Sequence, residues 1–509
     1  MPAHGAAHLR VTEEGEFKLA SERGVKDEYW VRFKTDVSPQ EIKALSKTIP
    51  KAHQGKLLHL FNEKSRAFTV RLKEDQARLL ARHPLVESVE QDTWVSVGPS
   101  VVTPSAVQPG APSHLDRIDE RVLPLDGKFD PNPGSTVAPG SGTTIYVIDT
   151  GIRTTHSEFQ GRAFIGSDFA NQPGELGYRT DCYGHGTSVA ALAVGKTYGV
   201  ARGATVVSLK TARGCQGNST AGSLKAAVDW VTAFGSPRSV VNMSLSGPVS
   251  RGMTEVEDAI RTSIAAGHTY VVAAGNNGGN ACDASPAREP QVITVAASSP
   301  TTDARWNLSN FGRCVDLYAP GQNVTTASSL SDSATLTESG TSFAAPQVAG
   351  AVAADMHRTP TPAAARDWQV FRATPQTISG EPNVNTNRLL RVGGRYENNT
   401  ATALKDNGQT NSSLSVFSEG DPESAMRTHL RVSFNISHAR RGNLQVDLVA
   451  PNGRTWRLHS FSSDTGDNIV QVNTPVAASD VPPNGTWTLR VQDRATGDTG
   501  TLQNWSLLF

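Results

Sequence analysis

The chain has 509 residues, several times the usual length of a domain, so two or three separate hydrophobic cores are expected. Its 48 Lys and Arg residues balance its 48 Asp and Glu residues, which argues against binding to nucleic acid or to a membrane surface. No apolar segment approaches the roughly 20 residues of a membrane helix, and the start of the chain lacks the apolar core of a secretory signal. We therefore expect either a cytosolic protein or an exported one whose signal has been removed.

The N-terminal part alternates short β-rich runs with helical ones. The β-rich runs are 29–33, 55–61, 67–72 and 86–91, and the helical runs are 39–49 and 74–83. This βαββαβ order predicts a small α+β domain with two helices on one face of a sheet. Residues 96–113 are rich in Pro, Gly and Ser and show neither the helical nor the strand periodicity of apolar residues. Such a composition is typical of an exposed linker.

The central part, from about 143 to 360, alternates apolar strands with helices. The expected strands are 144–149, 205–210, 239–245, 269–276 and 292–298, and the expected helices are 186–195, 221–234 and 255–267. This pattern is typical of an α/β domain whose parallel sheet is covered on both faces. Active sites of such sheets lie at the carboxyl ends of the strands.

The last part of the chain changes character again. Alternating strands at 429–437, 443–451, 455–461, 485–493 and 502–509 are separated by Asn-Gly and Thr-Gly turns. The segment 400–509 is therefore expected to be an all-β sandwich.

The sequence Asp-Thr-Gly at Asp149 is compatible with an aspartic or a serine protease, and it recurs at Asp464 and Asp498. An aspartic dyad needs two carboxylates about 3 Å apart in matched apolar surroundings. Only Asp149 follows an apolar strand, whereas the other two lie in polar turns of the β-rich part. The serine protease reading is therefore favoured.

The other parts of a serine protease site are present. His185 lies in Gly-His-Gly-Thr at the start of a helix of small residues, and Ser342 lies in Gly-Thr-Ser at another helix start. Asn276 ends a predicted strand, although an Asn after Gly is by itself more often a turn residue. A serine nucleophile needs a base, an anion that orients the base, and donors for the oxyanion. Ser342, His185, Asp149 and Asn276 can take these roles, with the Ser342 backbone N–H as a second oxyanion donor.

The order Asp, His, Ser and the motifs around these residues resemble those of the subtilisin-like serine proteases. The segments "SHLDRIDERVLPLDG", "YVIDTGIRTTHSEF" and "WNLSNFGRCVDLYAPG" are similar to the proteinase K and aqualysin branch, over about residues 106–392. Residues 29–95 resemble the inhibitory propeptide of this family, and residues 400–509 resemble the P domain of kexin-type convertases, a β sandwich or jelly roll. The resemblance implies three units, 1–105, 106–392 and 400–509, with self-cleavage somewhere near residues 95–110. A permanent N-terminal domain is the alternative.

Four cysteines allow three disulfide pairings, and none lies in a Cys-x-x-Cys arrangement that would suggest zinc. The resemblance implies the pairs Cys182–Cys215 and Cys282–Cys314, which belong outside the cytosol. A redox-sensing role for Cys182 is the alternative.

Calcium is the expected cofactor, with none needed for catalysis. Asp116, Asp119, Glu120 and Asp126 group oxygen donors of the kind that Ca²⁺ prefers, although a solvated acidic face would look the same. The resemblance adds a second calcium site from Asp316 with the carbonyls of Pro290 and Val292.

Two segments match the strands that line the first specificity pocket in this family: Ser244, Leu245, Ser246 and Gly247, and Ala273, Ala274, Gly275 and Asn276. Neither carries an acidic side chain that could select basic residues. We therefore expect broad cleavage after apolar or aromatic residues. Glycine is usual in the family at the position of Ser246, so we expect the Ser246 side chain to narrow the substrate channel. Ser188 and Gln347 replace histidines of the family, and Phe343 replaces an oxidisable methionine, which predicts tolerance to peroxide.

The sequence thus predicts a secreted, monomeric serine endopeptidase made as a zymogen, with protein substrates and its own propeptide as partners. The alternatives are a selective processing protease and a non-catalytic binding protein on a protease scaffold.

Overall fold

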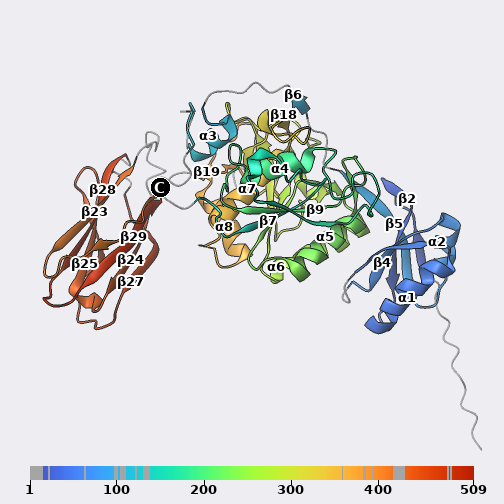
Figure 1. Cartoon of the computed structure of the whole chain (residues 1–509), viewed down its shortest axis with the longest axis horizontal. Coiled ribbons are helices and arrows are strands. Elements are labelled where there is room, and N and C mark those ends of the chain that lie inside the picture. Colours follow the sequence, from blue (N-terminus) through green and yellow to red (C-terminus); the bar gives the residue numbers. More distant parts are fainter. Residues whose placement is uncertain are drawn as a thin grey trace, which may run out of the picture.

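The computed structural model of the chain describes residues 15–508 apart from 21–22, 62–64, 97–100, 104–109, 121–122, 126, 130–137, 358, 382–385, 393–394, 417–429, 479–480 and 482–483. Three bodies follow one another along its longest axis, with the N-terminal body at one end and the C-terminal body at the other (Figure 1). Within the described residues, no helix has the length and apolar character needed to cross a membrane.

The N-terminal body is the expected βαββαβ unit with one additional strand. Its sheet order is β1-β5-β2-β4-β3. Ser38 starts the first helix with a capping box, since its hydroxyl accepts from Glu41 N while the Glu41 carboxylate accepts from Ser38 N. The elements are β1 (Glu16–Lys18), β2 (Gly24–Phe33), α1 (Pro39–Ala52), β3 (Lys56–Leu60), β4 (Ala67–Arg71), α2 (Glu74–Ala81) and β5 (Val86–Ser96).

The central body contains a nine-stranded sheet in the order β19-β20-β16-β15-β13-β11-β7-β9-β8. The run from β16 to β8 is parallel, as the alternation of apolar strands and helices predicted. Its strands are β7 (Thr144–Asp149), β8 (Ala163–Asp168), β9 (Thr205–Lys210), β11 (Val240–Met243), β13 (Thr269–Ala273), β15 (Ile293–Ser298), β16 (Leu317–Pro320), β19 (Thr374–Pro375) and β20 (Arg388–Leu389).

Helices cover both faces of this sheet. On one face α4 (His185–Val194), α7 (Thr341–Ala354) and α8 (Pro362–Arg372) bury small residues against the strands, and on the other lie α5 (Ala221–Phe234) and α6 (Arg251–Ala265). The α5–α6 cluster also contains Trp30, Phe61, Ala67 and Val95 of the N-terminal body. The N-terminal body has a core of its own around Phe33 and Phe68, and it also packs these four residues into the core beneath α5 and α6.

Short elements surround the central sheet. They are β6 (Val101–Thr103), α3 (Ser113–Asp119), β10 (Asn218–Thr220), β12 (Gly247–Pro248), β14 (Ala284–Ser285), β17 (Val324–Ala327) and β18 (Thr335–Ser339), with single 3₁₀ turns at Ser157–Phe159 and Ala281–Asp283. Strands β17, β18 and β6 form a separate antiparallel sheet.

The C-terminal body is the expected β sandwich, built around fully buried Trp487 and Trp505. Its first strand begins at Arg395, a few residues before the predicted start of this unit. One sheet holds β21 (Arg395–Asn398), β22 (Thr402–Ala403), β29 (Gly500–Leu508), β24 (Arg431–His438) and β27 (Ile469–Pro475). The other holds β23 (Gln409–Val416), β28 (Gly485–Asp493), β25 (Leu444–Val449) and β26 (Thr455–His459).

Candidate active site

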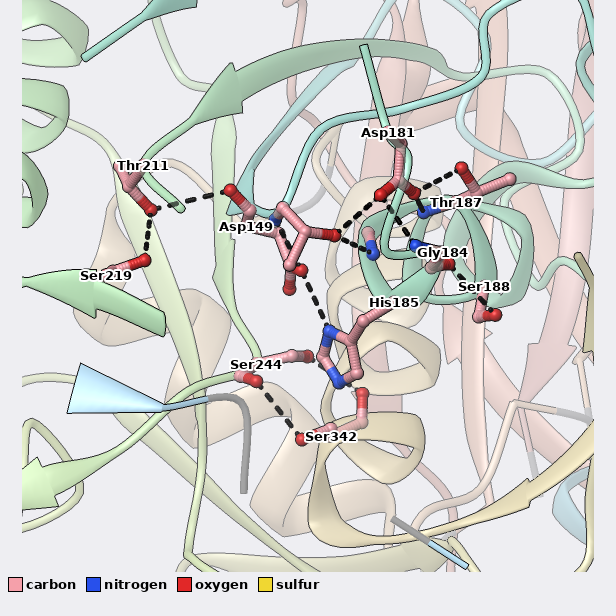
Figure 2. Close-up of polar contacts among 12 residues, drawn as sticks. Asp149, Asp181, Gly184, His185, Thr187, Ser188, Thr211, Ser219, Ser244 and Ser342 are labelled. Atoms are coloured by element: carbon pink, nitrogen blue, oxygen red, sulfur yellow. Dashed lines mark hydrogen bonds and ion pairs between the residues drawn. The ribbon is translucent and has the colours of Figure 1, made fainter. Parts of the chain in front are cut away.

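The residues predicted to carry chemistry come together at the carboxyl edge of the parallel sheet. Asp149 is the last residue of β7, and Asn276 follows the end of β13. His185 and Ser342 are the first and second residues of α4 and α7, two helices that pack side by side on one face of the sheet. Figure 2 shows the side chain of His185 between those of Asp149 and Ser342, with Ser342 pointing toward the imidazole ring.

Asp149 and His185 are buried and hydrogen-bonded, with 2.8 Å between Oδ1 and Nδ1. Asp149 Oδ1 also accepts from Thr150 N at 2.7 Å, which holds the carboxylate in place. Because an ionised carboxylate can only accept, the Nδ1 nitrogen carries the proton and Nε2 faces Ser342 with a lone pair. Burial by itself lowers the pKa of His185, but the charge and hydrogen bond of Asp149 outweigh it and leave the pKa above its ordinary value.

Asp181 fixes the start of the helix that carries His185. The sequence motifs did not predict this role. Its carboxylate accepts from Gly184 N and Thr187 N, both at 2.8 Å, and from the hydroxyls of Thr187 and Thr150. A carboxylate at a helix N-terminus satisfies unpaired N–H groups and favours the dipole. The signal in the sequence was an acidic residue four positions before His185.

Gly186 has no room for a side chain. A Cβ at this position would lie 2.1 Å from Gly151 O and 3.2 Å from the Asp149 side chain. The glycine after the histidine therefore allows α4 to approach the end of β7 closely enough for the Asp149–His185 hydrogen bond.

Ser342 is linked twice to the segment that follows β11. Its Oγ donates to Ser244 O at 3.1 Å, and its own carbonyl accepts from Ser244 Oγ at 2.8 Å. His185 Nε2 has no hydrogen-bond partner within the described residues. The Ser342 hydroxyl lies beside the His185 ring (Figure 2), and it is hydrogen-bonded to the backbone carbonyl of Ser244.

Asn276 is oriented by the residue that precedes the serine. Its Oδ1 accepts from Thr341 N at 2.9 Å and from Thr341 Oγ1 at 2.7 Å. This fixes the amide so that Nδ2 points away from Thr341, and a Cβ at Gly340 would lie 3.2 Å from it. The Asn276 N–H donor therefore lies next to Gly340, two residues before Ser342.

The two predicted pocket segments lie next to each other at the same edge. Leu245 and the two alanines, Ala273 and Ala274, are buried, so these segments contribute mainly backbone. A Cβ on Gly275 would lie 3.5 Å from Ser246 Oγ, which places the Ser246 hydroxyl between the segments.

The end of the N-terminal body enters this region. Residues Trp94–Ser96 of β5 pair antiparallel with β10, and Ser96 and Ser246 exchange backbone hydrogen bonds of 3.4 and 3.2 Å. Gly247 makes room for this strand, because a Cβ there would contact Val95. The chain therefore lies along the pocket segments as an added strand.

The comparisons with known proteins agree with this geometry. The subtilase family model matches residues 140–388, the peptidase inhibitor I9 model residues 19–97, and the proprotein convertase P-domain model residues 427–509. An extracellular serine proteinase of Thermus sp. (strain Rt41A) is 41% identical over 64% of this chain and 75% of its own length. The chain belongs to the subtilase family.

Two further relatives bear on this subtilase. A cuticle-degrading protease of Metarhizium anisopliae is 32% identical over 77% of the chain and 97% of its own length. The crystal structure of a cold adapted subtilisin-like serine proteinase superposes with a TM-score of 0.51, at 38% identity, over 56% of this chain and 98% of that one. The chain is therefore a serine protease of this family with an I9-type propeptide and a P domain.

Both disulfides of the subtilase have the predicted pairing, Cys182–Cys215 and Cys282–Cys314. The first ties the residue three before His185 to the loop that leads into β10. Cys182 is therefore part of a disulfide in this structure and not a free thiol.

The expected calcium sites are not assembled within the described residues. No group of three or more His, Cys, Asp and Glu side chains that could hold a metal is found there, and Asp126 lies outside the described part of the chain. In α3, Asp116 accepts from Gly127 N at 2.9 Å and Arg117 pairs with Asp303, while Asp119 and Glu120 stay untested as ligands.

Asp316, the carboxylate of the second calcium site expected from the family, is paired with an arginine in the structure. Asp316 Oδ1 accepts from the Arg366 guanidinium at 2.5 and 2.9 Å, and Oδ2 accepts from Thr294 N at 2.8 Å. An arginine cation thus occupies one oxygen of the carboxylate that was expected to bind the metal, and the roles of the Pro290 and Val292 carbonyls stay predictions.

Proposed function

We propose that the chain is the precursor of a secreted serine endopeptidase with Asp149, His185 and Ser342 as its catalytic triad. The observation that carries the proposal is the buried hydrogen bond from His185 Nδ1 to Asp149. It sets the tautomer in which Nε2, beside Ser342, accepts a proton.

The reaction follows from this tautomer. Ser342 Oγ attacks the substrate carbonyl while His185 Nε2 takes its proton, and Asp149 stabilises the imidazolium that forms. His185 then donates that proton to the leaving amine, and water hydrolyses the acyl-enzyme by the same route in reverse. The hydroxyl must rotate from Ser244 O to Nε2 when substrate binds, since both acceptors are neighbours of Ser342.

Asn276 Nδ2 and the Ser342 backbone N–H are the proposed oxyanion donors. Thr341 preorganises the amide before the substrate arrives, so no reorganisation is needed in the transition state. In subtilisin itself, loss of the corresponding type of side-chain donor costs about 10²–10³ in turnover, and a similar loss is expected for Asn276→Ala.

The pocket formed by 244–247 and 273–276 supports broad cleavage after apolar or aromatic residues. Neither segment carries a carboxylate, and a buried basic substrate residue would lose its hydration without a charged partner. The P domain favours a second candidate, a processing protease selective for basic residues. A cleavage profile dominated by paired arginines would decide for that candidate.

The N-terminal domain supports synthesis as a self-cleaving zymogen. Ser96 is bound at the pocket strands, and residues Val101–Thr103 pair with β18, the strand that leads into Ser342. The proposed self-cleavage site therefore lies between Ser96 and Val101, inside the broader range expected from the sequence. Two disulfides and a relative named as extracellular support secretion, and we propose a monomer with protein substrates.

The test is self-processing of the purified precursor together with active-site labelling. We expect a new N-terminus within residues 97–101 and covalent labelling of the mature protein by a fluorophosphonate. The Ser342→Ala precursor should stay full length and unlabelled. A wild-type protein that is folded yet neither processed nor labelled would instead support a non-catalytic binding protein on a protease scaffold.

A further inference from the structure

Strand β18 holds the chain on the side that follows the proposed self-cleavage site. Its residues pair antiparallel with β6 in the register Thr337–Thr103, Glu338–Val102 and Ser339–Val101. Figure 1 shows β6 beside β18, and β18 continues directly through Gly340 into α7, where Ser342 lies. Two pairings thus flank residues 97–100, one with β10 and Ser246 before them and one with β18 after them.

Cleavage between Ser96 and Val101 would turn β6 into the N-terminal end of the mature enzyme. The sheet order is β17-β18-β6, so departure of β6 leaves β18 as an edge strand with unpaired N–H and C=O groups. Such an edge binds an extended peptide by the same antiparallel hydrogen bonds, and alternate side chains of that peptide supply specificity. Strand β18 is then free for the part of a substrate that follows its scissile bond.

Glu338 is the acidic residue of this strand and lies opposite Val102 in the pairing with β6. It is only 7% exposed, and its Oε2 has no hydrogen-bond partner within the described residues. A buried carboxylate without a full set of partners is costly unless a cation or donor reaches it. Glu338 therefore marks a position that a positive charge would stabilise.

The groups that act on Glu338 lie at the catalytic centre and are already engaged. Asp149 is bonded to His185, and Asp181 accepts three hydrogen bonds from the start of α4 and one from Thr150. Ser188 Oγ donates to Ala327 O at 2.9 Å. Burial raises the pKa of Glu338, and the charges of Asp149 and Asp181 raise it further against the opposing effects of His185 and Ser188.

We propose that Glu338 is a specificity-determining residue, which selects a lysine or arginine in the leaving-group segment of substrates at the residue that takes the place of Val102 opposite it on β18. Residues directly opposite each other in such a pair have Cβ atoms about 4.5–5.5 Å apart on the same face, within reach of an ion pair. An acidic residue at this position would face a like charge. The inference deepens the proposed peptidase function and rests on it.

The test uses quenched fluorescent peptides with the chain's own sequence from Asp92 to Ala106, in which the residue at position 102 is Lys, Val or Glu. For the mature enzyme we expect kcat/KM to be about tenfold higher with Lys than with Glu. The matched control changes position 101 instead, because that position pairs with Ser339 and successive residues of a bound strand face opposite sides. The Lys and Glu peptides of the control series should differ by less than about twofold.

Glu338→Gln should remove the preference at position 102 without creating one at position 101. Because the Lys and Glu peptides are compared within each enzyme, a general loss of activity in the variant does not affect the ratio. The ratio for the wild-type enzyme tests the inference even if the variant does not fold. Equal cleavage of the Lys and Glu peptides at position 102, an equal preference at both positions, or an unchanged preference in Glu338→Gln would overturn the inference. Failure of the enzyme to cleave the Val peptide and to bind fluorophosphonate would contradict the proposed function instead.

Discussion

His185 can act as a base only while it is neutral, so its raised pKa sets the acid side of the activity profile. Burial lowers that pKa, but Asp149 raises it above the ordinary value of 6.5. Since protonation of His185 abolishes the base, kcat/KM of the mature enzyme should fall as the pH drops through a value above 6.5.

Asp149→Asn tests the cause of this shift. The variant removes the charge that favours the imidazolium, so the acid limb of kcat/KM should move to lower pH while turnover falls by on the order of 10⁴. The control is Asp332→Asn, an exposed carboxylate bonded to Arg153, which should leave the limb in place. An unchanged limb in Asp149→Asn would contradict the role given to this carboxylate.

Phe343 determines how the site withstands oxidation. Its ring is fully buried, with its centroid 5.4 Å from that of His185. A phenyl ring has no sulfur that peroxide could convert into a polar sulfoxide beside the imidazole. The mature enzyme should therefore keep most of its activity in dilute peroxide, and Phe343→Met should lose activity within the same time.

Phe343→Leu separates oxidation from packing, because it also changes the ring but adds no thioether. It should stay as tolerant as the wild type after correction for its initial activity. Rapid inactivation of the wild type would show that another group near the site is the oxidised one.

At the level of elements, the N-terminal domain completes the N-terminus of a helix in the catalytic domain. Asp92 of β5 is 1% exposed, and its Oδ2 accepts from Gly222 N at the start of α5 at 3.3 Å, while Oδ1 accepts from Trp30 and Thr93. Burial raises the pKa of Asp92 to about 6, despite these hydrogen bonds. The inhibitory domain thus places a carboxyl group where α5 has free donors.

Asp92→Ala should weaken the complex between the cut N-terminal domain and the enzyme. Loss of a helix-capping acceptor costs about 1 kcal/mol, so the release of activity after self-processing should become several-fold faster. Asp75→Ala, on the exposed first turn of α2, is the matched control and should leave the release unchanged. Equal release rates in the two variants would show that Asp92 does not contribute to inhibition.

The sequence predicted those elements and residues whose signals are local. Gly-His-Gly-Thr and Gly-Thr-Ser each combine a functional side chain with the glycine that its helix start needs, so His185 and Ser342 could be found from a few neighbouring letters. Asp181 and Glu338 could not, because their importance depends on which distant groups the fold places beside them. The pairing of β6 with β18 is likewise non-local, since an unpatterned linker is bound by a strand more than two hundred residues later. The pairing of Asp316 with Arg366 of α8 is likewise a contact that the motifs of the family resemblance did not reveal.

For the whole molecule, the distribution of hydrophobic cores differs between the two flanking domains. Besides a core of its own, the N-terminal domain contributes Trp30, Phe61, Ala67 and Val95 to the cluster beneath α5 and α6, so it is coupled to the catalytic domain. The P domain keeps a cluster of its own, which includes only residues from Tyr396 onward. Between the P domain and α8, the Arg431 guanidinium lies 4.6 Å from the centre of the Phe371 ring, a contact worth at most about 1 kcal/mol at an exposed site.

Domains with separate cores and weak contacts unfold separately. Calorimetry of the Ser342→Ala precursor, which cannot cut itself, should therefore show two unfolding transitions. One belongs to the P domain, residues 395–508, and the other to the N-terminal and catalytic domains together. Deleting the chain after Val392 should remove the first transition and shift the Tm of the second by no more than about 2–4 °C per kcal/mol of lost contact. A larger shift, or a single transition in the precursor, would mean that the P domain stabilises the catalytic domain directly. In that case its removal should also shorten the lifetime of the mature enzyme at high temperature, because kinetic stability depends on the same contacts.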